Sequence, residues 1–269
     1  MKNKLVVSPS PHIHGGDSIP KNMYGVLIAL IPAFLVSLYV FRLDAIIITL
    51  FSVLFCVGFE YLIAKFILKK QPTITDGSAI LTGVLLAFNL PSNLPLWILA
   101  IGALVAIGIG KMSFGGLGNN IFNPALVGRI FLLISFPAQM TTWPVPATAA
   151  TDAVTSATVL ANLKFNPDNL PSLTHMFLGT ESGSLGEMSA LALLLGLGYL
   201  LWKKIITWHI PTAILGTVAL FSGILYLIHP IPQHNPLIHL FSGGLMLGAI
   251  FMATDYVTSP LTKKGMLIY

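Results

Sequence analysis

Charged side chains are scarce in this chain of 269 residues, because Asp, Glu, Lys and Arg make up only 9% of it. Soluble domains contain about 25% of such residues. Since 55% of the residues are hydrophobic, a water-soluble globular domain is excluded, and most of the chain is expected to face lipid.

Cysteine is nearly absent as well. The single Cys56 lies within an apolar run, which excludes a disulfide framework and any cysteine-based iron–sulfur or zinc motif. His12 and His14 stand together without a third ligand, so no metal site is predicted. No set of nucleophile, base and acid is visible, and we therefore predict no catalytic residue.

The net charge of +5 does not indicate a nucleic-acid partner. Lysines stand singly or in pairs at the ends of apolar runs, as at Lys69-Lys70, Lys203-Lys204 and Lys263-Lys264. This distribution is typical of charges that orient a protein in a membrane rather than of a stripe that follows phosphates. The expected partner is membrane lipid.

Long uncharged runs dominate the chain, and residues 205–254 contain no Asp, Glu, Lys or Arg. A spanning helix needs roughly 20 apolar residues, so this run must fold back at its Pro, Asn and Gly residues. We predict an all-α fold, a polytopic membrane bundle. The hydrophobic segments, about eight, are 23–41, 45–67, 78–89, 95–110, 124–137, 189–202, 211–228 and 240–253.

The polar stretches divide the chain into an N-terminal arm at 1–22 and a membrane domain at 23–269, with a long polar loop at about 138–188. With a cytoplasmic N-terminus, the cytoplasmic side collects eleven lysines and the outer side only Arg42 and Lys164. The eleven are Lys2, Lys4, Lys21, Lys65, Lys69, Lys70, Lys111, Lys203, Lys204, Lys263 and Lys264. The positive-inside rule therefore predicts a periplasmic 138–188 loop.

Two short apolar pieces that end in polar Pro turns, 78–95 and 242–260, resemble each other when a gap is allowed. They are the third and eighth predicted segments, five crossings apart, so the two copies run in opposite directions. Such pairs of short segments predict an inverted repeat with half-spanning helices around a central site. The alternative is chance similarity between Gly- and Leu-rich membrane segments.

The tetrapeptide Thr155-Ser-Ala-Thr158 lies in the polar loop and resembles the (Ser/Thr)-Gly-Ala-Thr signature of bacterial proteins that carry FMN as a phosphoester. Taken alone, such a tetrapeptide is more often a Ser/Thr-rich surface turn. Five pieces in register strengthen the resemblance, and they are 8–14, 75–83, 115–125, 152–160 and 253–260. Together they are similar to the D subunit of the Rnf (Rsx) ion-translocating electron-transport complex. A more distant similarity is to the B subunit of the sodium-pumping NADH:quinone reductase.

The resemblance implies that Thr158 bears covalent FMN and that Asp152, Thr155, Ser156 and Ala157 form the recognition sequence of the FMN transferase. Ser156 stands where the family often has Gly. The resemblance also implies ten spans, two more than are visible here, a bacterial inner-membrane location and room for a noncovalent riboflavin.

The complex implied by the resemblance has six subunits and links ferredoxin and NAD to movement of Na+ or H+. Its other members include a second FMN-carrying protein and iron–sulfur proteins, so the isolated chain is expected to lack a complete activity. The competing interpretation is a solute channel or transporter without a redox cofactor.

Four further residues carry two interpretations each. Glu60 lies within a predicted span and belongs either to an ion path or to a pair with Lys65. Asp255 is either part of an ion path or a helix-end carboxylate, and Asp152 is a helix cap or a transferase contact. Arg129 either reaches to the membrane surface or binds a cofactor phosphate, and surface reach is favoured.

Overall fold

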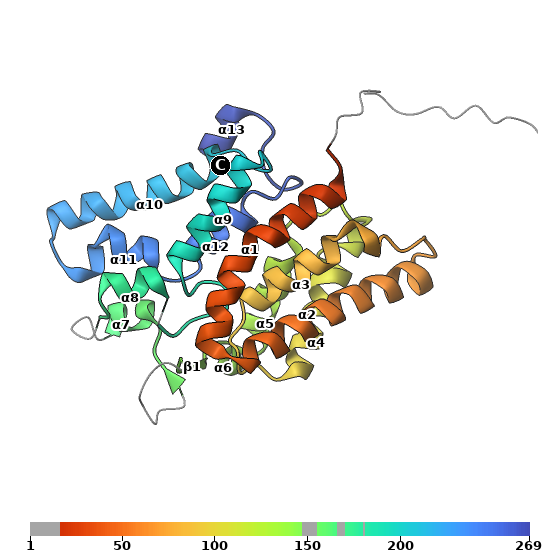
Figure 1. Ribbon diagram of the computed structural model, residues 1–269, viewed down its shortest axis with the longest axis horizontal. Coiled ribbons are helices and arrows are strands. Elements are labelled where there is room, and N and C mark those ends of the chain that lie inside the picture. Colours follow the sequence, from red (N-terminus) through yellow and green to blue (C-terminus); the bar gives the residue numbers. More distant parts are fainter. Residues whose placement is uncertain (1–16, 147–154, 166–169, 180) are drawn as a thin grey trace, which may run out of the picture.

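The computed structural model describes residues 17–146, 155–165, 170–179 and 181–269. These residues form a bundle of helices with one two-stranded ribbon (Figure 1). The 8–14 motif of the arm and Asp152 lie outside the described residues.

Four helical stretches in the described part are long and apolar enough to cross a membrane: 19–41, 43–67, 96–114 and 209–228. They contain α1 (Ile19–Phe41), α2 (Leu43–Leu62), α4 (Leu96–Leu104) and α10 (His209–Ile228). α2 continues in a π-helical turn at Ile63–Ile67, and α4 continues in another at Val105–Ile109. The predicted helical membrane architecture is thereby confirmed.

Shorter apolar helices lie between these stretches and after the last of them. They are α3 (Ser78–Phe88), α5 (Pro124–Ser135), α9 (Ala190–Trp202) and α12 (Leu245–Leu247), and α12 continues in a π-helical turn at Gly248–Met252. The start of α5 follows from its sequence, because Asn123 Oδ1 accepts from Ala125 N at 3.0 Å and Pro124 has no backbone N–H that would need an acceptor. The count of eight spans stays a prediction.

The remaining elements are small. The helices are α6 (Pro137–Met140), α7 (Val159–Phe165), α8 (Leu173–Leu178), α11 (Pro236–Phe241) and α13 (Lys263–Ile268). Single 3-10 turns lie at Ile74–Asp76, Met112–Phe114 and Pro232–His234. The strands β1 (Trp143–Pro144) and β2 (Thr155–Ser156) pair antiparallel, with Trp143 opposite Ser156.

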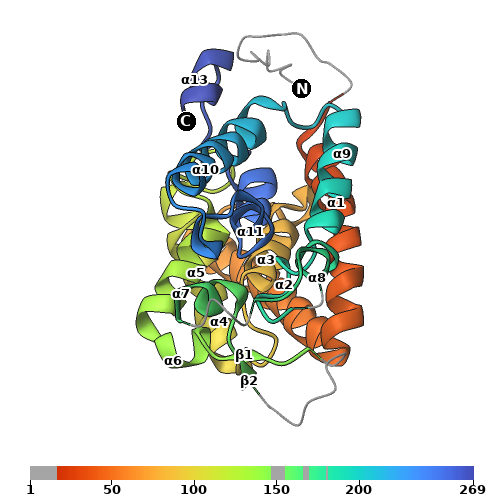
Figure 2. The ribbon, with the colours of Figure 1, turned by 90° about the vertical axis from the view of Figure 1, so that its left-hand side faces the viewer.

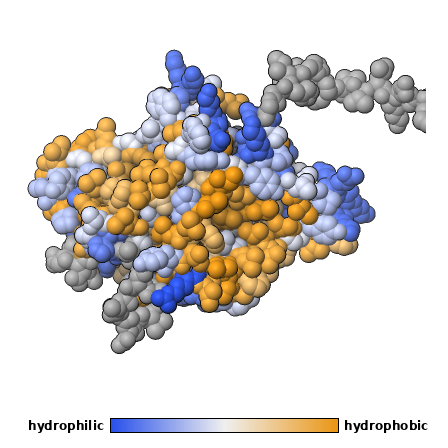
Figure 3. Space-filling view, viewed as in Figure 1, coloured by the Kyte–Doolittle hydropathy of each residue, from blue (hydrophilic) through white to orange (hydrophobic). Residues whose placement is uncertain are grey.

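The molecule has two distinct ends, which Figure 2 shows at top and bottom. The lysine end holds the start of α1, the end of α9 and α13, with the pairs Lys203-Lys204 and Lys263-Lys264 beside them. The ribbon end holds α6, β1 and β2. Between them, large apolar side chains of α1, α2 and α10 stay exposed, and an apolar band crosses the face in Figure 3. Lipid or neighbouring membrane proteins would cover such a band.

Glycine allows the closest helix contacts. A Cβ on Gly83 of α3 would lie 2.7 Å from Val53 Cα of α2, and one on Gly196 of α9 would lie 2.5 Å from the Ala29 carbonyl of α1. Ser52 Oγ also donates to the Gly83 carbonyl at 2.7 Å. Small residues and side-chain hydroxyls are how membrane helices pack without a hydrophobic driving force between them.

The last part of the predicted polar loop is buried rather than solvent-facing. Residues 182–186 are buried against the end of α3, where Leu185 N donates to the Leu90 carbonyl at 3.2 Å and Gly186 N to the Phe88 carbonyl at 2.8 Å. Ser37 of α1 also donates to the Leu185 carbonyl. These hydrogen bonds hold the end of the loop against α1 and α3. We call residues 182–186 the buried segment.

Candidate functional site

Thr158 lies at the ribbon end, shortly after β2 and directly before α7. Its Oγ1 accepts from Ala161 N at 3.3 Å, as an N-cap hydroxyl does. Thr158 is half-buried, whereas Thr155, Ser156 and Ala157 are exposed. The four residues of the predicted attachment sequence therefore share one turn at the molecular surface.

Ser156 fits this turn although the signature that it resembles has Gly there. The backbone φ of Ser156 is not positive, so the Ser156 side chain causes no backbone strain there. Its hydroxyl is bonded to Ser182 Oγ at 2.6 Å, and Ser182 belongs to the buried segment. Ser156 thus links the turn that contains Thr158 to the body of the protein.

A cavity of about 160 Å³ adjoins Thr158. Its wall combines apolar and polar groups, among them Trp143, Met176, Phe241, Arg129, Glu181, Glu187, Ser182 and Ser242. The turn at Gly243 closes one side: its φ is +67°, and a Cβ there would lie 2.7 Å from Leu160 Cδ1 of α7. Glycine suits this turn because its φ is strained for residues with a Cβ, whereas Leu160 Cδ1 is the end of a flexible side chain that can shift.

Two carboxylates of the cavity wall come from the end of the predicted loop. Burial raises the pKa of Glu181 above its ordinary 4.5, and the nearby His175 opposes the shift. Glu187 Oε1 accepts from Ser184 N at 2.9 Å, which holds that carboxylate in place.

Arg129 comes to the cavity from α5. Its Nη1 donates to Asn89 Oδ1 at 2.7 Å, and the side chain lines the same cavity as Thr158. The favoured interpretation of surface reach is therefore wrong: the guanidinium points between α5 and the end of α3. The sequence alone could not show this, because Asn89 lies 40 positions away.

The chemistry of these residues suits a flavin attached through its phosphate. The Thr158 hydroxyl lies at the edge of a cavity, Trp143 and Phe241 offer aromatic surface for a ring, and polar groups complete the wall. The phosphate would join at Thr158, and the ring would provide the electron chemistry when bound.

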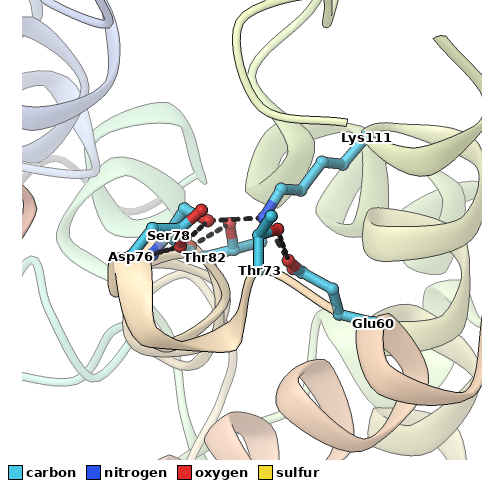
Figure 4. Close-up of polar contacts among 6 residues, drawn as sticks. All are labelled: Glu60, Thr73, Asp76, Ser78, Thr82 and Lys111. Carbon is cyan, nitrogen blue, oxygen red and sulfur yellow. Dashed lines mark hydrogen bonds and ion pairs between the residues drawn. The ribbon is translucent and has the colours of Figure 1, made fainter. Parts of the chain in front are cut away.

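A second polar group lies toward the lysine end, where Glu60 and Lys111 are buried between α2 and the end of the α4 stretch (Figure 4). Lys111 Nζ lies 2.6 Å from Glu60 Oε2 and 2.6 Å from Ser78 Oγ. The alternative pair with Lys65 is wrong, because Lys65 Nζ donates instead to Tyr61 OH at 2.7 Å. In the sequence, Lys111 is one of the eleven lysines expected on the cytoplasmic side, and nothing near it in the chain marks it as the partner of Glu60.

Hydroxyls and one more carboxylate complete this cluster. Thr73 Oγ1 donates to Glu60 Oε1 at 3.2 Å, and Ser78 Oγ donates to Asp76 Oδ1 at 2.5 Å (Figure 4). Ser78 also opens α3, because its backbone N donates to Asp76 Oδ1 at 2.8 Å. Glu60 is therefore a fully paired group inside the bundle, which is what an intramembrane carboxylate requires.

Asp255 follows the π-helical turn of α12 and is partly buried at the lysine end. Asn120 Nδ2 donates to its Oδ2 at 3.4 Å. Burial raises the pKa of Asp255, opposed by hydrogen bonds from the Val257 backbone, Asn120 and Thr258. Asp255 lines a cavity of about 80 Å³ that also contains Lys111 and Ser78, so this cavity and the Glu60 cluster adjoin.

Each of these three residues lies within a few positions of a π-helical turn: Glu60 before 63–67, Lys111 after 105–109, and Asp255 after 248–252. Such turns occur often at functional sites because they shift side chains out of the regular helical order. Among the described residues, no group of three His, Cys, Asp or Glu could hold a metal ion.

Membrane-length helices around buried charged groups define a polytopic helical membrane protein. Comparison with known proteins gives the family. The chain belongs to the NQR2, RnfD, RnfE family, whose model matches residues 6–269.

Curated relatives match nearly the whole chain. The D subunit of the Na+-translocating ferredoxin:NAD+ oxidoreductase complex of Acetobacterium woodii is 49% identical over 269 residues, covering 98% of this chain and 81% of the relative. The D subunit of the proton-translocating complex of Clostridium ljungdahlii is 42% identical over 277 residues, covering 100% and 83%. The D subunit of the ion-translocating oxidoreductase complex of Rhodobacter capsulatus is 40% identical over 288 residues, covering 96% and 80%.

Proposed function

We propose that this chain is a membrane electron-transfer protein that carries FMN on Thr158 by a phosphoester. The observation that supports this most directly is the half-buried Thr158 hydroxyl at the edge of a mixed polar and aromatic cavity. Thr158 is an anchor in this proposal, whereas Trp143 and Phe241 exclude water from the ring. Thr155, Ser156 and Ala157 are exposed, as a sequence recognised by a transferase must be. Asp152 completes that sequence in the proposal.

The proposed setting is the D position of a complex that couples ferredoxin and NAD+ electron transfer to ion movement, as the names of the relatives state for them. The proposed partners are five other subunits, among them a second FMN-carrying protein and iron–sulfur proteins, together with the FMN transferase. The isolated chain would then carry electrons without completing the reaction.

Glu60 and Asp255 are proposed to border an ion path at the lysine end. Glu60 is paired with Lys111, and the adjoining cavity contains Asp255, so an ion entering there would meet carboxylate and amide oxygens. The names of two relatives give different ions, sodium and proton, so the ion must be measured for this chain. The measurement is ion uptake into vesicles by the whole complex with Asp255→Asn, and unchanged uptake would remove Asp255 from the path.

A noncovalent riboflavin is also proposed at the lysine end, and only part of it would enter the cavity, because about 80 Å³ is less than its ring needs. Asn120, Asn123 and Asp255 offer hydrogen-bonding groups, and Phe251 offers aromatic surface. Gly115, Gly116 and Gly118 have positive φ and shape the turn that brings Asn120 there. Extraction of flavin from denatured protein, followed by chromatography, tests this part.

The proposed orientation places the lysine end in the cytoplasm and Thr158 in the periplasm of the bacterial inner membrane. Thr141→Cys and Lys204→Cys provide a matched pair, because both positions are exposed and lie toward opposite ends. The native Cys56 is fully buried and should not react. An impermeant thiol reagent added to whole spheroplasts should label Thr141→Cys alone, and the reverse pattern would refute the orientation.

The attachment is tested on protein produced together with its transferase. We expect a fluorescent denatured band on a gel and an FMN adduct on the peptide that contains Thr158. Both should be lost in Thr158→Ala while the protein still accumulates in the membrane. A wild-type peptide without adduct would favour the solute channel or transporter interpretation.

A further inference from the structure

Arg129 carries a charge that no carboxylate among the described residues neutralises in an ion pair. In that part of the chain, the ion pairs within 4.0 Å are Lys21–Asp17 and Lys111–Glu60. The Arg129 guanidinium is half-buried on α5, an apolar helix, and its described partner is the neutral amide oxygen of Asn89 at 2.7 Å. Charged residues inside a membrane bundle are costly and commonly mark a functional site.

Asn89 fixes the direction of this guanidinium. The Asn89 side chain is buried, and its Nδ2 donates to the Leu85 carbonyl at 2.6 Å and approaches Met252 Sδ at 3.8 Å. Both contacts use the amide nitrogen, so the amide oxygen is left to face Arg129. Asn89 thereby holds Arg129 on the wall of the cavity that also contains Thr158.

Glu187 is a competing partner for Arg129 in the wall of the same cavity. A Cβ added to Gly244 would lie 3.4 Å from Glu187 Oε2 and 3.5 Å from Arg129 Nη1, so the two charged groups flank the same glycine. They nevertheless form no ion pair within 4.0 Å, and Glu187 Oε1 accepts from Ser184 N instead. The guanidinium therefore has no carboxylate partner among the described residues, and it lines the same cavity as Thr158.

We propose that Arg129 binds the phosphodiester that joins Thr158 to FMN; this inference rests on the proposed function. A phosphodiester keeps its negative charge whether the ring is oxidised or reduced, so it compensates Arg129 permanently. A reduced ring would supply charge only part of the time. Arginine binds phosphate through two parallel N–H groups, which fixes position as well as charge. Arg129 is thus a positioning residue, with Asn89 supporting it.

The test uses the assembled complex produced with its transferase, in the wild type and in Arg129→Gln, Arg129→Lys and Glu187→Gln. Peptide mass reports attachment, and the phosphorus-31 NMR shift and linewidth of the phosphodiester report its contact with the cation. The flavin midpoint potential is measured on the same samples.

We expect Arg129→Gln to change the phosphorus shift and narrow the line, because the phosphodiester then moves more freely. Losing a charge-assisted contact lowers the ratio of phosphodiester bound at residue 129 to unbound phosphodiester roughly ten-fold or more. Arg129→Lys should restore part of the effect, and Glu187→Gln should not narrow the phosphorus line, because that variant keeps the Arg129 cation. If Arg129→Gln accumulates without attached flavin while Arg129→Lys is loaded, the proposal is also supported.

Three outcomes overturn the proposal while the proposed function stands. The first is a loaded Arg129→Gln protein with an unchanged phosphorus signal and a midpoint potential that is not lowered. The second is the same change in Glu187→Gln, which would make Glu187 the partner of Arg129. The third is a lowered midpoint potential with an unchanged phosphorus signal, which would place the cation at the ring. A wild-type protein without an FMN adduct removes the proposed function itself, and peptide mass distinguishes that case.

Discussion

Lys111 Nζ lies 2.6 Å from Glu60 Oε2, with both side chains almost completely removed from solvent at 2% and 0% exposure. The pair joins α2 to the end of the α4 stretch, 51 residues apart in the chain. Its opposite charges compensate each other inside an apolar bundle, so each residue requires the other.

Lys111→Met should therefore destabilise the protein strongly, by about 3–5 kcal/mol, because it leaves Glu60 buried and unpaired. The double change Glu60→Leu with Lys111→Met should recover most of that loss. Thermal unfolding in detergent measures both, with Lys65→Met as the control at an exposed position. Additive losses in the double variant would contradict the pairing.

Ser156→Gly should leave flavin attachment at the wild-type level, because Thr158 keeps its hydroxyl and its place in the turn. The change removes the hydrogen bond to Ser182 Oγ, which costs about 1 kcal/mol at most in such a setting. Gel fluorescence and the unfolding temperature give the two readouts. Ser182→Ala is the matched control for the hydrogen bond, and loss of fluorescence in Ser156→Gly alone would show that Ser156 itself is needed for attachment.

Gly186→Ala should destabilise the protein by about 1–3 kcal/mol, as overpacking of a buried contact does. The added Cβ would lie 2.4 Å from Phe88 Cβ, at the end of the buried segment. Gly198→Ala in α9 is the matched control, since a Cβ there meets no atom within 4 Å. The control should be neutral or slightly stabilising. Equal unfolding temperatures for the two variants would show that the segment is not packed against α3.

The raised pKa of Glu181 predicts a pH dependence of stability. Because burial favours the protonated form, the contribution of Glu181 is complete below its ordinary pKa of 4.5 and is lost as pH rises through the raised pKa. Glu181→Gln should therefore be more stable than the wild type above that window and equal to it near pH 4.5 or below. Unfolding temperatures across pH measure the difference, and Asp44→Asn serves as an exposed control. A difference that grows toward low pH would contradict the sign.

Periodicity and length predicted most of the helices, because lipid contact imposes a long apolar run whatever the tertiary contacts are. The short α3 and the small residues of the 242–260 piece were also visible in the sequence. Ser78, at the start of the first piece, and Asp255, toward the end of the second, line one cavity. Asn89, toward the end of the first, and Gly244, at the start of the second, both lie near Arg129, so the two pieces run in opposite directions. The inverted repeat itself stays a prediction.

Long-range pairing was not predictable in the same way. Nothing in the local sequence joins Lys111 to Glu60 or Arg129 to Asn89, since both pairs form only when helices are brought together. The buried segment was predicted as loop because Ser and Gly dominate it. Its backbone is satisfied by carbonyls at the end of α3, a source of hydrogen bonds that composition does not reveal.

The short helix α3 has eleven residues and measures about 16 Å at 1.5 Å per residue. Its first residue, Ser78, bonds to the Lys111 ammonium, while Phe88, Asn89 and Leu90 at its other end hold the loop backbone and the Arg129 guanidinium. The helix α3 thus connects the Lys111–Glu60 pair to Arg129 in the interior. A shift of α3 along its axis would alter the contacts of both charged groups at once, which couples them without the movement of a domain.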